Sequence, residues 1–271
     1  MVLGLIRLIH PAPAITVTAL SGALGAIFLA QEGQELASGR LALTVLAVAG
    51  SQVMTGALND WADRDRDRIA QPAKPIPSGQ VTPSAALALA LAGGLLQLAA
   101  SIPLGGVALL MGIAASASAA AYNLWLSRTP FSVVPYVVSF GILPLWVAAG
   151  VGVPLSRVVV APLIVGPFAA AAHLANTLRD FDADARLGAR NLAQTLGRRA
   201  AMTLAWALAV GVGLAVGIAL IAGGTWQAAT VGLGVIGLAA VAQGAGSAQR
   251  LWYGMLVAAL CWTVAWALAT G

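Results

Sequence analysis

The sequence concentrates its acidic side chains in two short clusters. Seven of its nine Asp and Glu residues lie there. Each cluster follows an asparagine with the spacing Asn-x-x-x-Asp-x-Asp-x-Asp, which begins once at Asn59 and once at Asn176. Chance is a poor explanation for the same pattern occurring twice, so we treat both copies as parts of one site. The aspartates are Asp60, Asp63, Asp65, Asp67, Asp180, Asp182 and Asp184.

The spacing of the first cluster places most of its polar side chains on one face of a helix. With 3.6 residues per turn, positions i, i+4 and i+8 drift only slowly around the axis. Asn59, Asp63 and Asp67 are therefore predicted to project together, with Asp60 at the edge of the same arc and Asp65 pointing roughly the opposite way. The second cluster is expected to behave alike, with Asp182 as the exception.

Carboxylates arranged in this way favour a magnesium and phosphate site. Mg²⁺ is commonly held by one or two carboxylates together with substrate phosphates, so two facing Asp clusters suit a metal-bridged diphosphate. The alternative is that acidic residues at helix ends solvate a loop or pair with neighbouring arginines. Such pairing would not require the same spacing twice. The neighbouring arginines are Arg64, Arg66, Arg68 and Arg179.

Basic residues follow each motif. Lys74 opens the Pro-bounded loop 74–79, and Arg186 and Arg190 follow the second cluster. A third polar stretch carries Tyr122 and Arg128, which are candidates for completing a phosphate shell. Arg binds phosphate through a bidentate fork and Lys as a point charge. The alternatives are ordinary cytoplasmic loop charges and, for Tyr122, a ring in the interfacial aromatic belt.

The composition shows which elements must carry these residues. The chain is 60% hydrophobic and 8% charged, whereas soluble domains have about 25% charged residues. Apolar runs of about 20 residues, the length of a bilayer-crossing helix, recur between short polar breaks, and lipid excludes unpaired backbone groups. We therefore predict one all-α integral membrane domain, 1–271, with nine transmembrane helices. They span residues 12–30, 41–58, 84–102, 105–124, 132–150, 158–178, 200–222, 226–243 and 252–270.

The basic residues indicate the orientation of these helices rather than binding of nucleic acid, despite a net charge of +5. With the N-terminus in the cytoplasm, twelve of the 14 Lys and Arg residues fall on the inner side and only Arg40 and Arg157 on the outer side, as the positive-inside rule requires. Four crossings separate the two Asp clusters, so both are expected on the cytoplasmic side, facing each other. The single cysteine, Cys261, excludes a disulfide framework within the chain.

These motifs resemble those of the UbiA superfamily of intramembrane prenyltransferases. The resemblance rests on Asn59-Asp60-x-x-Asp63-x-x-x-Asp67, the loop 74–79 and Asp180-x-x-x-Asp184, and it extends along the whole chain. It implies a bundle of nine helices around a central cavity, with cytoplasmic loops that cap a diphosphate site and a lateral opening for the lipid tail.

The resemblance also implies roles for individual residues. Mg²⁺ would bind Asp63 and Asp67 on one side of the diphosphate and Asp180 and Asp184 on the other. The residues implied to bind substrate are Asn59, Asp60, Lys74, Tyr122, Arg128, Asn176 and Arg190. Residues 59–79 resemble the chlorophyll synthase and archaeal ether-lipid branch, whereas residues 176–192 resemble the menaquinone branch. The acceptor therefore stays open.

The function expected from the sequence is transfer of a prenyl group from an isoprenyl diphosphate to a lipophilic or aromatic acceptor. The enzyme would work in the lipid of a bacterial or archaeal cell membrane, with its active site on the cytoplasmic side. One alternative is a terpene cyclase that uses the same ionisation step. Alternatives from another class are a cation transporter, since membrane carboxylates can define an ion path, and a lipid-binding protein without turnover.

His173 lies one helical turn before Asn176 and is expected on the same arc. It would either orient an acceptor or take up a proton there, or be a packed and hydrogen-bonded membrane histidine. The aromatic residues Phe131, Tyr136 and Trp146 are candidates for stabilising an allylic cation, although aromatic rings in membrane helices mostly pack or mark interfaces.

Overall fold

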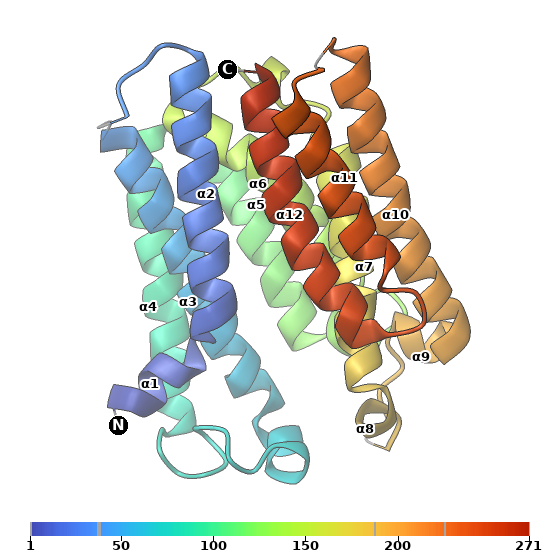
Figure 1. Cartoon of the computed structure of the whole chain (residues 1–271). Helices are drawn as coiled ribbons and strands as arrows, with labels where there is room; N and C mark the ends of the chain where they lie inside the picture. The colour runs from blue at the N-terminus through green and yellow to red at the C-terminus, as the bar shows by residue number, and fades with distance from the viewer. Residues whose placement is uncertain (1, 37–38, 187, 225, 271) are drawn as a thin grey trace. The chain divides into compact units, whose positions relative to one another are not determined.

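A computed structural model describes residues 2–36, 39–186, 188–224 and 226–270. Throughout these residues every regular element is a helix (Figure 1). The elements are α1 (Val2–Leu8), α2 (Pro11–Gln31), α3 (Gly39–Ala70), α4 (Pro83–Ser101), η1 (Ile102–Leu104), α5 (Gly106–Leu124), η2 (Leu126–Arg128), α6 (Val134–Val151), η3 (Leu155–Arg157), α7 (Pro162–Arg179), α8 (Phe181–Arg186), α9 (Leu192–Leu196), α10 (Arg198–Ala222), α11 (Ala228–Ala242) and α12 (Ala248–Thr270).

Each of the nine predicted spans falls on one of these helices. Among the described residues, seven helices have the length and apolar composition needed to cross a membrane. Of the other two, α11 has only 15 residues, and α7 carries His173, Asn176 and Arg179 in its 18 residues. The all-helical membrane architecture is confirmed, and the number nine stays a prediction. The seven are Pro11–Gln31, Gly39–Ala70, Pro83–Leu104, Gly106–Leu124, Val134–Val151, Arg198–Ala222 and Ala248–Ala269.

The chain divides into two compact units. Unit 1 contains Met1–Ser127 and Ile142–Val159, and unit 2 contains Arg128–Gly141 and Val160–Gly271. The first Asp cluster therefore belongs to unit 1 and the second to unit 2. Whether the two clusters face each other, and whether the chain acts as one domain, stay predictions.

Unit 1 is built on close packing of α3 against α4. A Cβ atom on Gly50 would lie 2.7 Å from the carbonyl oxygen of Gly93, and one on Gly93 would lie 2.8 Å from that of Gly50. Only glycine permits this approach of two backbones, which is the usual means of associating helices in lipid. This packing fixes α4 against α3, the helix that carries the first Asp cluster.

The short helix α1 lies across the start of α2 instead of continuing it (Figure 1). His10, between the two helices, has φ 49° and ψ 70° and is the only non-glycine residue with positive φ among the described residues. Leu8 is fully buried with Ala57 of α3 and with Ile76 and Val81 of the loop that follows α3. This apolar cluster fixes α1 beside the first Asp cluster and its loop.

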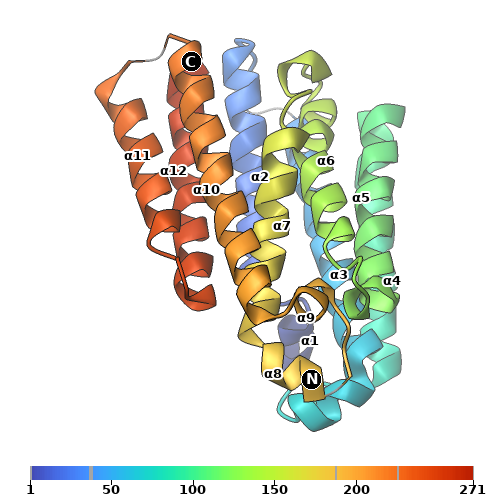
Figure 2. The ribbon, with the colours of Figure 1, turned by 90° about the vertical axis from the view of Figure 1, so that its right-hand side faces the viewer.

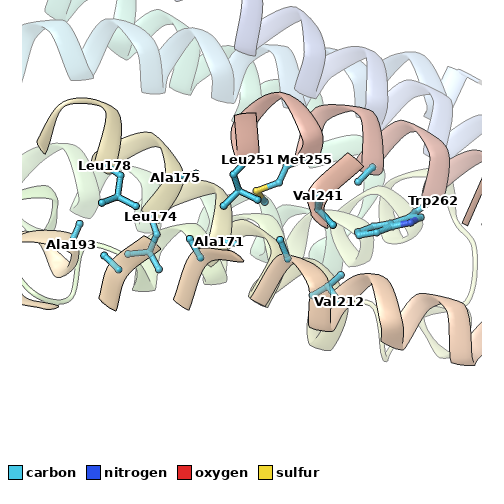
Figure 3. Packing of buried hydrophobic residues seen from close by; sticks show 14 residues of the cluster. Ala171, Leu174, Ala175, Leu178, Ala193, Val212, Val241, Leu251, Met255 and Trp262 are labelled. Carbon is cyan, nitrogen blue, oxygen red and sulfur yellow. The ribbon is translucent and has the colours of Figure 1, made fainter. Parts of the chain in front are cut away.

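Unit 2 is organised around α7, α10 and α12, with α11 packed on α10 and α12 (Figure 2). Its core combines alanines of α7 and α10, such as Ala175 and Ala205, with larger side chains of α7 and α12, such as Leu174, Met255 and Trp262 (Figure 3). Trp262 of α12 lies against Gly213 and Gly237 and donates a hydrogen bond to the carbonyl of Gly234 at 3.2 Å. This core supports α7, which leads into the second Asp cluster.

Candidate active site

The first Asp cluster stands on the last turns of α3. This helix has 32 residues and is therefore about 48 Å long at 1.5 Å per residue, whereas the hydrocarbon core of a bilayer is about 30 Å thick. The surplus lies at the polar C-terminal end, so the cluster extends beyond the hydrocarbon on a continuous helix. The sequence predicted the apolar run 41–58 and a helical Asp cluster after it, and α3 carries both before it ends at Ala70.

The carboxylates of this cluster are divided between two faces of α3, as predicted. Asp60 and Asp67 are buried, at 2% and 4% exposure. The side chain of Asp65 is 71% exposed and pairs with Arg68 at 3.3 Å. The alternative of loop solvation and local pairing thus describes Asp65 but not the two buried aspartates. Asn59 lies on the buried face and donates a hydrogen bond to Asp63 Oδ2 at 3.5 Å.

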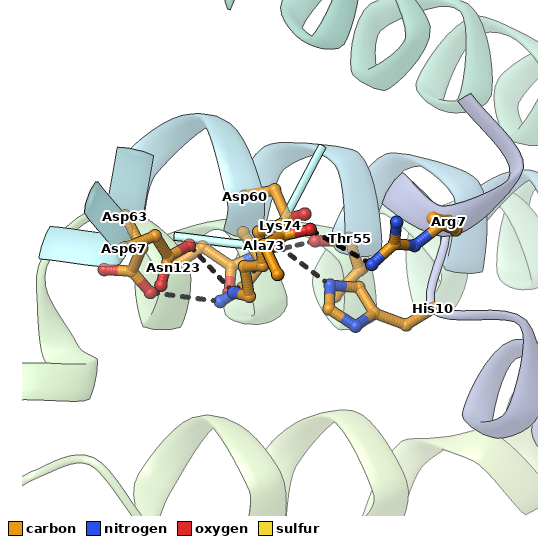
Figure 4. A network of polar contacts seen from close by, with 10 residues as sticks. Arg7, His10, Thr55, Asp60, Asp63, Asp67, Ala73, Lys74 and Asn123 are labelled. Atoms are coloured by element: carbon orange, nitrogen blue, oxygen red, sulfur yellow. Dashed lines mark hydrogen bonds and ion pairs between the residues drawn. The ribbon is translucent and has the colours of Figure 1, made fainter. Parts of the chain in front are cut away.

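Lys74 joins the two buried aspartates (Figure 4). Its Nζ lies 3.0 Å from Asp60 Oδ1 and 2.8 Å from Asp67 Oδ2. The loop folds back because Ser78 N–H bonds to the carbonyl of Lys74 at 3.1 Å and Gly79 adopts φ 74°. Burial lowers the pKa of Lys74, but its bonds to Asp67 and Asp60 outweigh this effect and hold the pKa above its ordinary value. The ammonium therefore stays charged among the carboxylates.

Two residues that the sequence analysis missed complete this network. His10 Nε2 lies 3.0 Å from Asp60 Oδ1, and Asn123 joins α5 to α3 through Asn59 (3.3 Å) and the carbonyl of Thr55 (2.9 Å). Asn123 directly follows the predicted substrate residue Tyr122. A polar side chain at the end of an apolar helix was the available signal for Asn123, whereas His10 lies fifty positions from its partner and no spacing pointed to it.

The second Asp cluster does not lie on one continuous helix, so that prediction is wrong. α7 ends at Arg179, Asp180 has φ −101° and ψ 12°, and a separate helix, α8, begins at Phe181. Asp180 is exposed, whereas Asp184 is 8% exposed. Asp182 points outward and pairs with Arg198 at 2.7 Å, as expected for the residue off the shared face.

Asp184 is held by another residue that was missed, Asn191. The Asn191 side chain donates from Nδ2 to Asp184 Oδ2 at 3.0 Å and accepts at Oδ1 from the Gln194 backbone N–H at 3.0 Å. One amide group thereby both caps α9 and holds the carboxylate of Asp184.

The predicted phosphate ligands Arg128 and Arg190 are joined through their backbones, because the Arg190 N–H donates to the Arg128 carbonyl at 3.3 Å. Both residues are exposed. Asn176 is half-buried on α7.

His173 is fully buried in unit 2. Its Nε2 lies 2.9 Å from Ser132 Oγ, and its ring lies 4.6 Å from that of Tyr136 between centroids. Ser132 also accepts from the Leu192 backbone N–H at 3.1 Å. These contacts favour the packed, hydrogen-bonded histidine over an acceptor-binding one. Trp146, 1% exposed in the core of unit 1, is likewise a packing residue.

The donor set fits magnesium held jointly with a phosphate ligand. Within the described part of the chain, no group of three or more His, Cys, Asp or Glu side chains is arranged to hold a metal by itself. The buried face of α3 instead offers carboxylate oxygens, which are the hard ligands that Mg²⁺ prefers, next to a lysine that can neutralise phosphate oxygens. Carboxylates that would suit such an ion are Asp63 and Asp67 within unit 1 and, taken separately, Asp180 and Asp184 within unit 2.

Comparison with known proteins decides the family. The model of the UbiA prenyltransferase family matches residues 18–250. The chain belongs to this family. This confirms the predicted superfamily and the predicted enzyme class, a prenyltransferase, and it identifies the chain as an integral membrane protein.

Similar proteins include several named prenyl-transferring enzymes. The digeranylgeranylglyceryl phosphate synthase of Halobacterium salinarum is 30% identical over 86% of this chain and 84% of its own. The 4-hydroxybenzoate octaprenyltransferase of Paraburkholderia phymatum is 31% identical over 81% and 75%. The 33 kDa chain of bacteriochlorophyll synthase from Rhodobacter capsulatus is 31% identical over 56% of this chain, and the match spans about half (53%) of that relative.

Solved structures share the fold. A UbiA homologue from Archaeoglobus fulgidus, bound to GPP and Mg²⁺, has a TM-score of 0.73 at 15% identity and covers 99% of this chain and 100% of its own. The apo structure of a UbiA homologue from Aeropyrum pernix K1 has a TM-score of 0.74 at 19% identity over 92% and 95%. At these identities the likeness concerns the fold.

Proposed function

We propose that this protein is a Mg²⁺-dependent intramembrane prenyltransferase that cleaves an isoprenyl diphosphate and transfers the prenyl group to a lipophilic or aromatic acceptor. The observation that carries the proposal is the buried arc on α3, where Asp60 and Asp67 share the ammonium of Lys74 beyond the apolar part of the helix. A transporter would need its carboxylates along a path through the bilayer, whereas these stand at one end of it.

The proposed roles follow the chemistry of each side chain. Asp63 and Asp67 of the first cluster, and Asp180 and Asp184 of the second, bind Mg²⁺. Lys74 contacts the diphosphate as a point charge, while Arg128 and Arg190 bind phosphate oxygens through their forks. Asn59, Asp60, Tyr122 and Asn176 complete the substrate shell. The distribution of basic residues supports a cytoplasmic active site.

The reaction breaks the allylic C–O bond, and its electron pair leaves with the diphosphate. When bound, Mg²⁺ supplies Lewis-acid neutralisation of the charge that develops on this leaving group. Lys74, already fixed between two carboxylates, adds a preorganised positive charge that needs no reorganisation during the step. The allylic cation is then captured by a nucleophilic carbon or oxygen of the acceptor, which loses a proton to complete the transfer.

The names of the relatives suggest a few chemical classes of acceptor to test on this protein. Two of the names give a product, bacteriochlorophyll or digeranylgeranylglyceryl phosphate, and the third gives 4-hydroxybenzoate as the group that receives the prenyl chain. The matches to bacteriochlorophyll and digeranylgeranylglyceryl phosphate synthases support the branch that residues 59–79 resemble. We therefore place an ether-lipid or a chlorophyll-type precursor ahead of a quinone precursor in the acceptor panel.

Product analysis by mass spectrometry tests the proposal. Purified protein is incubated with Mg²⁺, prenyl diphosphates of several lengths and the acceptor panel, and both prenylated product and released diphosphate are measured. The matched variants are Asp63→Asn, on the buried face, and Asp65→Asn, two residues away on the exposed face. We expect Asp63→Asn to lower turnover at least about 100-fold, in line with the loss of key electrostatic stabilisation, and Asp65→Asn to remain within about twofold of the wild type.

The other outcomes would redirect the assignment. A cyclic hydrocarbon formed without acceptor atoms would identify a terpene cyclase. Absence of Mg²⁺-dependent diphosphate release with every substrate would refute the enzymatic proposal and favour transport or lipid binding. Equal losses in both variants would mean that the division of α3 into two faces has no functional meaning.

A further inference from the structure

We propose that His10 is a positioning residue for the diphosphate site, an inference that rests on the proposed function. It acts through Asp60, whose carboxylate it shares with Lys74, and thereby fixes the ammonium of Lys74 against the first Asp cluster. The N-terminal segment would then be part of the catalytic apparatus rather than a mere lead-in to the first membrane helix.

The contact between His10 and Asp60 has a defined direction. A carboxylate only accepts hydrogen bonds, so the Nε2–H of His10 is the donor to Asp60 Oδ1, at 3.0 Å. The same oxygen accepts from Lys74 Nζ at 3.0 Å. With Asp60 at 2% exposure, the two donors determine which way this carboxylate points. Rotation of Asp60 would move one of the two anchors of Lys74.

The backbone at His10 carries a conformational cost that its side chain explains. A non-glycine residue at φ 49° and ψ 70° occupies the left-handed region, which is unfavourable for an L-residue because its Cβ comes too close to the backbone. Such residues persist where the surroundings enforce them, and they cluster at functional sites. Here the left-handed turn separates α1 from α2 and brings the imidazole to Asp60 (Figure 4).

The rest of the N-terminal segment contacts both the loop that carries Lys74 and the helix α3 that carries Asp60. Arg7 donates to the carbonyl of Ala73, the residue before Lys74, at 3.1 Å. A Cβ atom on Gly56 of α3 would meet the Ile9 backbone at 2.9 Å, so glycine at this position allows the chain to pass directly over α3. The segment from Arg7 to His10 is therefore fixed to the helix that carries Asp60 and to the loop that carries Lys74.

Three substitutions at His10 separate positioning from structural support. His10→Gln keeps a hydrogen-bond donor of similar reach and also keeps the strained left-handed backbone. His10→Ala removes the donor but keeps the backbone strain. His10→Gly removes the donor and relieves the strain, because glycine adopts positive φ without penalty. Thr16→Ala is the matched control, because Thr16 is an exposed residue of α2 whose hydroxyl bonds to the Ala12 carbonyl. Each variant is tested for kcat, for KM, for thermal unfolding and for direct binding of an unreactive prenyl thiolodiphosphate in the presence of Mg²⁺.

In His10→Ala and His10→Gly we expect the Kd of the analogue and the KM of the prenyl diphosphate to rise about tenfold. In His10→Gln and Thr16→Ala both constants should stay within about threefold of the wild-type values. His10→Gly should unfold at a temperature equal to or above that of His10→Ala. Binding that follows stability instead, with His10→Gly restored to the wild-type value, would overturn the inference. So would unchanged binding in all variants of an active protein. Absence of binding and turnover in the wild type would instead refute the proposed function.

Discussion

Removing the positive charge of Lys74 tests the electrostatic design of the first Asp cluster. Lys74→Met keeps an unbranched chain of similar length but leaves Asp60 and Asp67, both nearly inaccessible to solvent, without the ammonium that joins them. A hydrogen bond to a charged group contributes about 1.5–3 kcal/mol. Asp60 keeps its bond to His10, so the loss is concentrated on Asp67. We expect the free energy of unfolding to fall by about 3 kcal/mol.

Mg²⁺ should compensate this loss in a specific way. A ligand at 100 times its Kd stabilises the folded state by about 2.7 kcal/mol, which is close to the whole deficit. In the wild type, an ion approaching Asp67 competes with the ammonium that lies 2.8 Å from Oδ2. We therefore expect Mg²⁺ to raise the unfolding temperature of Lys74→Met at least twice as much as that of the wild type. Prenyl transfer by Lys74→Met should stay impaired even with Mg²⁺, because the diphosphate loses a cationic contact.

The assay is thermal unfolding in detergent at several Mg²⁺ concentrations and constant ionic strength. At about 2–4 °C per kcal/mol, Lys74→Met should unfold at least about 6 °C below the wild type without Mg²⁺. Lys74→Arg retains a positive charge, so its unfolding temperature without Mg²⁺ and its increase in unfolding temperature on adding Mg²⁺ should both lie closer to those of the wild type. Equal stability of Lys74→Met and wild type without Mg²⁺, or equal responses to Mg²⁺, would refute the electrostatic account.

Two further predictions concern unit 2. Asn191→Ala should loosen α9 and lower transfer, because a lost N-cap costs about 1 kcal/mol and Asp184 loses a bond of about 1.5–3 kcal/mol. Amide hydrogen exchange over residues 192–196 measures the loosening, and unchanged exchange would contradict it. Ser132→Ala removes the hydroxyl that buried His173 and the Leu192 N–H share as a hydrogen-bond partner. The free energy of unfolding should fall by about 1–3 kcal/mol. Unfolding of Ser132→Ala at the wild-type temperature would show that these contacts contribute little.

The parts of the fold that the sequence predicted are those set by local spacing. Apolar runs of about the bilayer thickness mark helices because lipid leaves few alternatives for the backbone. Likewise, the i, i+4, i+8 spacing of Asn59, Asp63 and Asp67 determines their common face once the segment is helical. The opposite orientation of Asp65 follows from the same geometry, and its side chain is indeed exposed.

The residues that the sequence did not predict are those brought in by tertiary contacts. His10, Asn123 and Asn191 each bond to a motif residue from another element. Two of them directly follow a residue that was predicted, Tyr122 or Arg190, yet the motif spacing contains nothing that requires an amide at these positions. His10 additionally depends on a left-handed turn, and the sequence around it, a histidine followed by proline, is compatible with several turns.

The two copies of the motif show that equal spacing gives equal geometry only when the helix is continuous. After Asn59, α3 runs on to Ala70, so the first cluster is organised by its own helix. After Asn176, the chain leaves α7 at Arg179, although residues 180–186 contain neither glycine nor proline.

What holds α8 in its separate position is a set of contacts from farther along the chain. Gln194 donates to the Phe181 carbonyl at 2.6 Å, and Arg198 lies over the Phe181 ring at 4.7 Å. Asn191 fixes Asp184 from the same side. Tertiary contacts thus override local helix propensity at the second cluster. Substitutions in α9 and at the start of α10 can therefore change the geometry of the second cluster without replacing an aspartate. The geometry of the first cluster can be changed in this indirect way mainly through Lys74, Asn123 and His10.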